Sequence, residues 1–146
     1  MPEVGRSDPE YWLKMLMGLS ISAYQLGEKL REEEELYDPD GSVHEAKLNA
    51  YRFECDCNER NGRLIMSSPM SSRQRRLMKL RYLKKKPWND IIRYMNTDRR
   101  YTFRIHEHAL RGILKRSGGT DFESEYRAEK ARFDELNPYT REYEDE

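Results

Sequence analysis

The sequence predicts an all-α protein, with an N-terminal antiparallel helical hairpin, a central three-helix helix-turn-helix unit and an acidic C-terminal tail. Two observations indicate these parts: apolar residues recur every three or four positions through most of the chain, and the sign of the charge reverses twice along it. The chain has 146 residues, of which 37% are charged and 36% hydrophobic. That composition suits one small domain with a helical arm and excludes a thick, many-layered core.

The first predicted helix starts at a capping box of Ser7 and Glu10, with Pro9 in its first turn, and extends to about Glu35. Residues 38–41, with the sequence Asp-Pro-Asp-Gly, then end the helix and turn the chain. One apolar stripe runs along this helix with the spacing of a coiled coil. Its members are Trp12, Leu16, Leu19, Ala23, Leu26 and Leu30.

A second long helix is predicted after a capping box of Ser42 and Glu45. Two long helices joined by a short turn bury their stripes against each other, which predicts a coiled-coil-like antiparallel hairpin over residues 1–66. A homodimer through residues 8–66 is the alternative, and its two-fold symmetry would set the spacing of two DNA half-sites. The stripe of this helix, interrupted at Arg60, is Val43, Ala46, Ala50, Phe53, Cys57 and Leu64.

The Ser-rich residues 66–72 mark a boundary, and residues 70–116 carry three further helical patterns. The first is capped by Ser71 with Gln74, the second runs from about Trp88 to Met95, and the third runs from Thr97 or Asp98 to about Arg116. A three-residue turn between the last two helices is typical of a helix-turn-helix. The buried side of the third helix, Thr102, Ile105, Ala109, Gly112 and Ile113, is expected to pack on Leu77, Leu80, Ile91 and Met95.

Residues 117–146 form the predicted acidic tail, because two glycines follow Ser117 and stop the third helix. A short helix is predicted within it, since Phe122, Tyr126, Phe133 and Leu136 share one face, and its last eight residues are expected to be disordered. The simplest role for the tail is a solubilising extension. Contact with RNA polymerase and a cover over the basic central segment are the alternatives.

The charge is divided unevenly along the chain, although 27 basic and 27 acidic residues cancel overall. Residues 1–69 carry 8 Lys and Arg against 14 Asp and Glu, residues 70–116 carry 15 against 3, and residues 117–146 carry 4 against 10. Because charge acts within a Debye length of about 8 Å, the central segment is expected to bind a polyanion.

The third helix of the central segment separates into a buried side and a strongly basic side. An α-helix fits the DNA major groove, and an arginine side chain matches the O6 and N7 acceptors of guanine. Arg99, Arg100 and Arg104 are therefore the predicted base readers, with His108 on a flank of the same side. The predicted phosphate contacts are Arg111, Lys115, Arg73, Arg75, Arg76, Lys84, Lys85 and Lys86. Six to eight such contacts predict an affinity loss of roughly three orders of magnitude between 50 and 200 mM salt.

A resemblance to a known family is carried by residues 70–110, MSSRQRRLMKLRYLKKKPWNDIIRYMNTDRRYTFRIHEHAL, which are about 41 of the 146. They resemble region 4 of bacterial sigma factors and, more closely, the sigma-region-4-like domain of small phage and prophage transcription regulators of the RinA and ArpU type. The matching pieces are RQR with LMKLRYL, WNDII with a later M, and NTDRRY with FRIH and AL.

This resemblance implies that the third helix enters the major groove through Arg99, Arg100, Arg104 and His108, in a double-stranded DNA-binding regulator of phage or mobile-element genes. Thr102 departs from the family, which usually has an apolar residue there, and Lys84 to Lys86 replace a loop that often contains Gly. No part of the chain resembles the promoter-opening regions of a complete sigma factor.

Two other functions fit the same pattern. A phage small terminase-like DNA packaging protein also joins a helix-turn-helix to an oligomerising helical segment, and a ring-sized mass would favour it. A basic helical adaptor or inhibitor would instead bind an acidic protein surface, and failure to shift duplex DNA in a gel would favour that reading.

No catalytic motif is found, so the chain is predicted to be a non-enzyme without a cofactor or a metal. The pairs Cys55 with Cys57 and His106 with His108 cannot hold zinc, because helical residues two apart point about 200° away from each other. Cys57 is expected to pack in the stripe, Cys55 to be exposed, and His106 to be half-buried and hydrogen-bonded. Two cysteines, no apolar leader and no membrane-spanning stretch predict a cytoplasmic protein without membrane contact.

Overall fold

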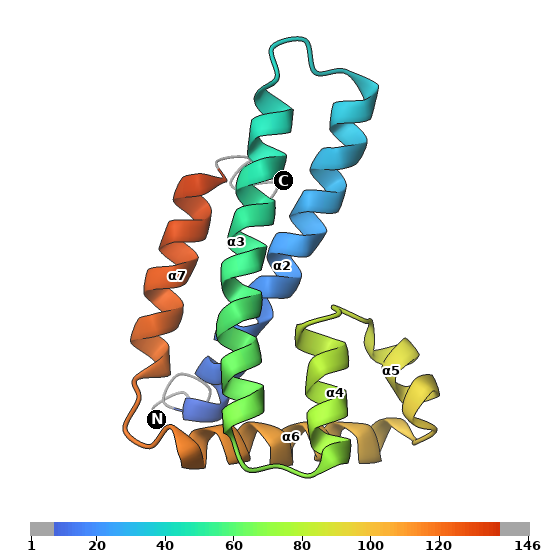
Figure 1. The fold of residues 1–146 in the computed structure, drawn as a ribbon, viewed down its shortest axis with the longest axis vertical. Helices are drawn as coiled ribbons and strands as arrows, with labels where there is room; N and C mark the ends of the chain where they lie inside the picture. Colours follow the sequence, from blue (N-terminus) through green and yellow to red (C-terminus); the bar gives the residue numbers. More distant parts are fainter. Residues whose placement is uncertain (1–7, 138–146) are drawn as a thin grey trace, which may run out of the picture.

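The computed structural model describes residues 8–137 and contains six helices and no strand in that range. Figure 1 shows how these helices are arranged. The predicted all-α class is therefore confirmed. Over the same residues, no helix has the length and apolar character needed to cross a membrane. The helices are α2 (Pro9–Leu36), α3 (Ser42–Ser67), α4 (Ser72–Tyr82), α5 (Trp88–Met95), α6 (Arg99–Arg116) and α7 (Phe122–Leu136).

The two long helices α2 and α3 lie side by side and run in opposite directions (Figure 1). All six residues of the predicted α2 stripe are buried. In α3 the stripe continues from Cys57 through Asn61 and Ile65, whereas the expected Val43 and Leu64 are only half-buried. Burial of Asn61 is tolerated because its amide donates to the carbonyl of Met17 at 3.0 Å and to Ser20 Oγ at 3.2 Å.

Helix starts differ from the predictions at two places. The cap of α2 is Asp8, whose carboxylate accepts the Glu10 N–H at 3.0 Å, and the predicted cap Ser7 lies outside the described residues. The predicted capping box of α3 is wrong, because its N-cap is Gly41 at φ 74° and makes no side-chain bond. Asp38 compensates by accepting the backbone N–H groups of Val43 at 3.0 Å and His44 at 2.9 Å.

Helix α6 crosses the lower ends of α2, α3 and α4 (Figure 1). Its N-terminal half packs on α4, and its C-terminal half continues beneath α2 and α3. At Gly112 the helix passes so close to the connection before α4 that an added Cβ would lie 2.6 Å from the carbonyl oxygen of Pro69. Of the four expected packing partners of α6, Leu77 and Ile91 are fully buried, whereas Leu80 and Met95 are half-buried at the edge of the core.

Helix α7 packs along α2 and α3, so the part of the predicted tail that ends at Leu136 is not an extension (Figure 1). The Phe133 ring lies 4.9 Å from the Phe53 ring, and the Tyr126 ring lies 5.7 Å from the Trp12 ring. The helix itself was predicted by its apolar face. The last eight residues, for which disorder was expected, lie outside the described range.

Candidate nucleic-acid interface

The first turn of α6 is fixed by its cap. Asp98 accepts the Tyr101 N–H at 2.7 Å, and the Thr102 hydroxyl lies 2.7 Å from the Asp98 carbonyl oxygen. Thr102 is fully buried, and its hydroxyl is also bonded to Thr97 at 2.6 Å, so this buried polar group has its hydrogen-bond partners. The cap at Asp98 and the buried Thr102 therefore fix which side of α6 faces the core and which side is exposed.

The predicted exposed side of α6 is exposed in the structure. Thr102, Ile105, Ala109 and Ile113 are buried on the opposite side of the helix. The exposed side carries Arg100, Arg104, Glu107, His108, Arg111 and Lys115. Four of these six side chains are arginine or lysine, so the helix presents a basic face along most of its length.

Two arginines are held on the flanks of this face. Arg99 donates to Asn89 Oδ1 at 2.8 Å and lies over the ring of Phe103 at 5.7 Å. Arg73, at the start of α4, donates to the Tyr101 hydroxyl at 3.0 Å, and its guanidinium lies over the Tyr101 ring at 5.6 Å. Both contacts are exposed, so the guanidinium groups are positioned without being buried.

Asn89 and Tyr101 were not predicted as site residues. A signal for Tyr101 was present, because it lies on the edge of the exposed side when α6 is drawn as a wheel. The role of Asn89 depends on how α5 packs beside α6, which the spacing of apolar residues does not give.

A shallow groove between α4 and α5 extends the basic surface. The Arg76 guanidinium lies over the ring of Tyr94 at 5.9 Å, and both side chains line a hollow of about 300 Å³ together with Arg73. Lys84 and Lys86 line a second hollow of about 340 Å³ that also includes Tyr94. These two lysines are exposed, on the loop at the end of α4 remote from Arg73 (Figure 1).

Two predicted phosphate contacts are corrected by the structure. The Lys85 ammonium forms an ion pair with Glu54 of α3 at 2.7 Å, and only 4% of its side chain is exposed. Arg75 is half-buried and donates to the Ser68 carbonyl at 3.3 Å. Both side chains therefore hold the chain together and are turned away from a ligand.

Among the basic residues on the exposed side of α6, Arg111 alone forms ion pairs within the described range. Its Nε lies 3.4 Å from Glu10 and its Nη2 lies 3.8 Å from Glu107, while 61% of the side chain remains exposed. The basic character of the face is thus strongest near the start of α6, where Arg99, Arg100 and Arg104 lie.

Ion pairing divides the basic residues of the chain into two groups. Of the 15 lysines and arginines in residues 70–116, only Lys85 and Arg111 form ion pairs within the described part of the chain. Basic residues outside that segment are paired far more often, as shown by Arg31, Lys47, Arg63, Arg127, Lys130 and Arg132. The carboxylates of the described residues therefore leave the central segment uncompensated, and a polyanion would relieve that repulsion.

A buried polar contact lies directly behind the basic face. The Tyr82 hydroxyl lies 2.7 Å from His106 Nε2, and the His106 side chain is more deeply buried than expected, at 4% exposed. Burial, with the positive charges of Lys14 and Arg81, lowers the pKa of His106 to about 3. His106 is therefore a neutral packing residue near pH 7. The Trp88 ring packs edge-on against its imidazole, with the ring centroids 4.9 Å apart.

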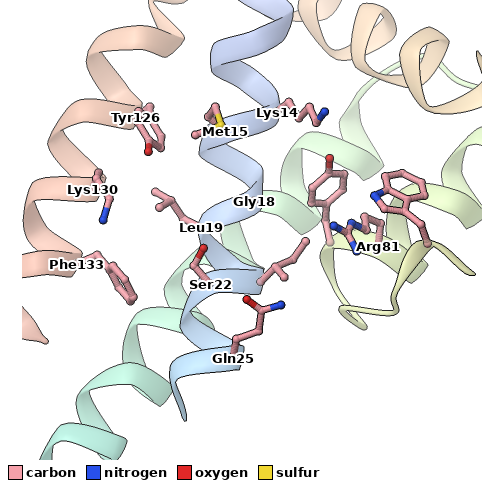
Figure 2. A pocket seen from close by; sticks show the side chains of 13 residues that line it. Lys14, Met15, Gly18, Leu19, Ser22, Gln25, Arg81, Tyr126, Lys130 and Phe133 are labelled. Carbon is pink, nitrogen blue, oxygen red and sulfur yellow. The ribbon is translucent and has the colours of Figure 1, made fainter. Parts of the chain in front are cut away.

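A cleft of about 320 Å³ crosses the outer side of α2, between α7 and the pair α4 and α5. Figure 2 shows side chains of different character in this cleft, among them Lys14, Ser22, Arg81 and Phe133. Across residues 8–137 no three His, Cys, Asp or Glu side chains gather closely enough to hold a metal ion. Cys57 is buried in the stripe and Cys55 is exposed, as expected.

Comparisons of this chain with family models, with curated proteins and with solved structures find no match.

Proposed function

We propose that this protein is a sequence-specific double-stranded DNA-binding transcription regulator whose α6 enters the major groove. The observation that carries the proposal is the exposed side of α6, where Arg100 and Arg104 have no carboxylate partner among the described residues. An α-helix fits the major groove, and arginine is the side chain that most often reads guanine there. In this role the protein is a non-enzymatic binding protein.

The basic side chains have two roles in the proposed complex: some contact base edges and others contact the phosphate backbone. Arg100 and Arg104 contact base edges. Arg99, which the sequence predicts as a base reader, is held on one flank of the helix by Asn89 and is assigned to a phosphate instead, as is Arg73 on the other flank. Lys115 lies further along the helix and contacts the backbone as the helix leaves the groove. Helices α5 and α6, joined through Asn96, Thr97 and Asp98, act as the helix-turn-helix pair, as the resemblance to sigma-region-4-like phage regulators implies.

The readers are tested by the double variant Arg100→Ala with Arg104→Ala. A duplex is first selected from a random library with the wild-type protein, and its affinity is measured by fluorescence anisotropy. Each arginine–guanine contact is worth about 1–3 kcal/mol, so each substitution lowers the affinity for the selected duplex by roughly 5-fold to 150-fold and has a smaller effect on a scrambled duplex. Circular dichroism should be unchanged, because both side chains are exposed.

Arg52→Ala is the matched control, since Arg52 is an exposed arginine on α3, away from α6. The affinity of this variant should equal that of the wild type. Equal affinity of the double variant for selected and scrambled duplexes supports the assignment, whereas retained preference for the selected duplex contradicts it. If the wild type binds no duplex even at about 50 mM salt, an acidic protein surface becomes the better ligand.

A further inference from the structure

The cleft on the outer side of α2 contains charge of one sign. Its volume is about 320 Å³, and the described residues that line it belong to α2, α4, α5 and α7, with none from α6. The charged side chains among them are Lys14, Arg81 and Lys130, and none of the lining residues carries a carboxylate. By contrast, the hollow of about 470 Å³ between α3 and α7 is lined by arginine and glutamate side chains together.

Two of the three cations in the cleft are uncompensated within the described part of the chain. Lys130 pairs with Asp134 at 2.8 Å, whereas neither Lys14 nor Arg81 forms an ion pair with a described residue. Burial lowers the pKa of His106, and the positive charges of Lys14 and Arg81 lower it further. The two cations therefore act on the same region of the protein, and no carboxylate there relieves their repulsion.

Arg81 is held in place with hydrogen-bond donors to spare. Its Nη1 donates to the Lys86 carbonyl oxygen at 3.1 Å, and its guanidinium lies over the Trp88 ring at 4.8 Å. A guanidinium has five N–H donors, and Arg81 makes no other hydrogen bond to a described residue. The side chain is half-buried, and burial lowers its pKa. An unpaired charge is costly to bury, so an anion in the cleft would stabilise this arginine.

The rest of the cleft offers apolar contact on the side away from Arg81. Figure 2 shows Lys14 and Arg81 on one side of Gly18, and the lining side chains of α7 on the other. An anionic group placed between Lys14 and Arg81 would therefore extend its apolar part across Gly18 toward α7. The apolar and aromatic residues that line the cleft are Met15, Leu19, Ile21, Trp88, Tyr126 and Phe133.

We propose that this cleft binds a small aromatic acid, with the anionic group between Lys14 and Arg81 and the ring directed across Gly18 toward α7. The uncompensated cations select an anion, and the planar guanidinium suits a carboxylate or a phosphate. The aromatic side chains favour a ring, and a volume of about 320 Å³ is that of a site for one small molecule. The proposal does not rest on DNA binding, because no residue of the cleft belongs to α6.

Binding is tested by equilibrium dialysis of the full chain with naphthoate, naphthyl phosphate and the neutral naphthamide. The two anions should bind, and naphthamide should bind at least about 10-fold more weakly, because it lacks the charge that interacts with Lys14 and Arg81. Tighter binding of naphthoate assigns the natural ligand to the carboxylates, whereas tighter binding of naphthyl phosphate assigns it to the phosphate esters. Both results support the site.

The position of the ligand is tested with two variants. Arg81→Gln removes the charge-assisted hydrogen bonds and should weaken binding of both anions by roughly 10-fold to 100-fold. Gly18→Leu fills the cleft and should abolish binding, and its fold should be intact because no atom lies within 4 Å of the added Cβ. Circular dichroism checks the fold of both variants.

Each variant has a matched control. Gly27→Leu is in the same helix as Gly18→Leu and is equally free of close atoms, but Gly27 does not line the cleft. Arg93→Gln removes an exposed arginine of α5 that also lies outside the cleft. Both controls should bind naphthoate as the wild type does.

Loss of anion binding in Arg81→Gln and Gly18→Leu, with wild-type binding in the two controls, supports the proposal. Equal affinity for naphthoate and naphthamide overturns it, as does an unchanged naphthoate affinity in either cleft variant. Failure of the wild type to bind either anion at about 1 mM also overturns it.

Discussion

Single charged residues in this protein differ chiefly in whether a carboxylate lies within reach. The exposed position of Arg100 and Arg104 could be predicted from the sequence, because helical periodicity alone places them opposite the apolar residues. The burial of Lys85 could not, since its partner Glu54 is distant in the sequence and the two meet only through the packing of α4 on α3. Three consecutive lysines look equivalent in a sequence, yet one is structural and two are exposed.

The buried imidazole of His106 predicts a loss of stability in mild acid. Its pKa is lowered to about 3 by burial, Lys14 and Arg81, whereas an unfolded histidine titrates near 6.5. Between these values the unfolded chain binds a proton that the folded chain excludes, so stability is full above about pH 6.5 and falls as the pH is lowered. The expected slope approaches about 1.4 kcal/mol per pH unit.

The measurement is urea unfolding of the wild type and His106→Gln at intervals from pH 7 to pH 4.5. The variant retains a polar partner for Tyr82 and should lack the histidine contribution, so the difference between the two proteins should change with pH over this range. Parallel curves would contradict the assignment.

Because Lys85 and Glu54 form a buried ion pair, substitution of Lys85 is expected to lower the stability of the fold and to leave DNA binding unchanged. Lys85→Ala leaves the Glu54 carboxylate, whose side chain is only 16% exposed, without its partner, and should lower the free energy of unfolding by about 3 kcal/mol. Lys84→Ala, at the exposed neighbour, should change it by less than about 0.5 kcal/mol. The salt dependence of duplex binding should be the same for Lys85→Ala as for the wild type, and a shallower dependence would restore Lys85 to the interface.

Each helix could be located from its apolar spacing, and the ends of α2, α4, α5 and α6 lie close to the predicted positions. What the spacing does not contain is which helix lies against which. The apolar face of α7 predicts a helix, but its burial against Phe53 and Trp12 depends on the surface that α2 and α3 leave open. Likewise, the C-terminal half of α6 packs beneath α2 and α3, a contact that a separate three-helix unit does not require.

The close approach of α6 to the connection before α4 predicts an effect opposite to the usual one for glycine in a helix. Gly112→Ala places a Cβ 2.6 Å from the Pro69 carbonyl oxygen and should destabilise the fold by about 1–3 kcal/mol. Gly62→Ala, in α3 with no atom within 4 Å, should stabilise it by up to about 1 kcal/mol. Thermal unfolding of the two variants tests this, and equal stabilisation by both would show that α6 does not pack on the connection.

At the scale of the molecule, most basic residues of the two acidic segments form ion pairs within residues 8–137, whereas most of those in the central segment do not. Helix α6 lies at one end of the molecule, and the acidic α7 packs on the sides of α2 and α3 rather than over the exposed side of α6 (Figure 1). The division of charge could be read from the sequence by counting. That the basic side of α6 remains uncovered by α7 depends on the tertiary packing.

The most direct measurement is a methylation-interference experiment on a duplex selected by the wild-type protein. Dimethyl sulfate modifies guanine N7, an acceptor in the major groove that Arg100 and Arg104 are proposed to contact. Methylation of a few adjacent guanines should abolish wild-type binding, and the same modification should not weaken the residual binding of the Arg100→Ala, Arg104→Ala variant further. Wild-type binding that tolerates methylation at every guanine would contradict the reading of the major groove by α6.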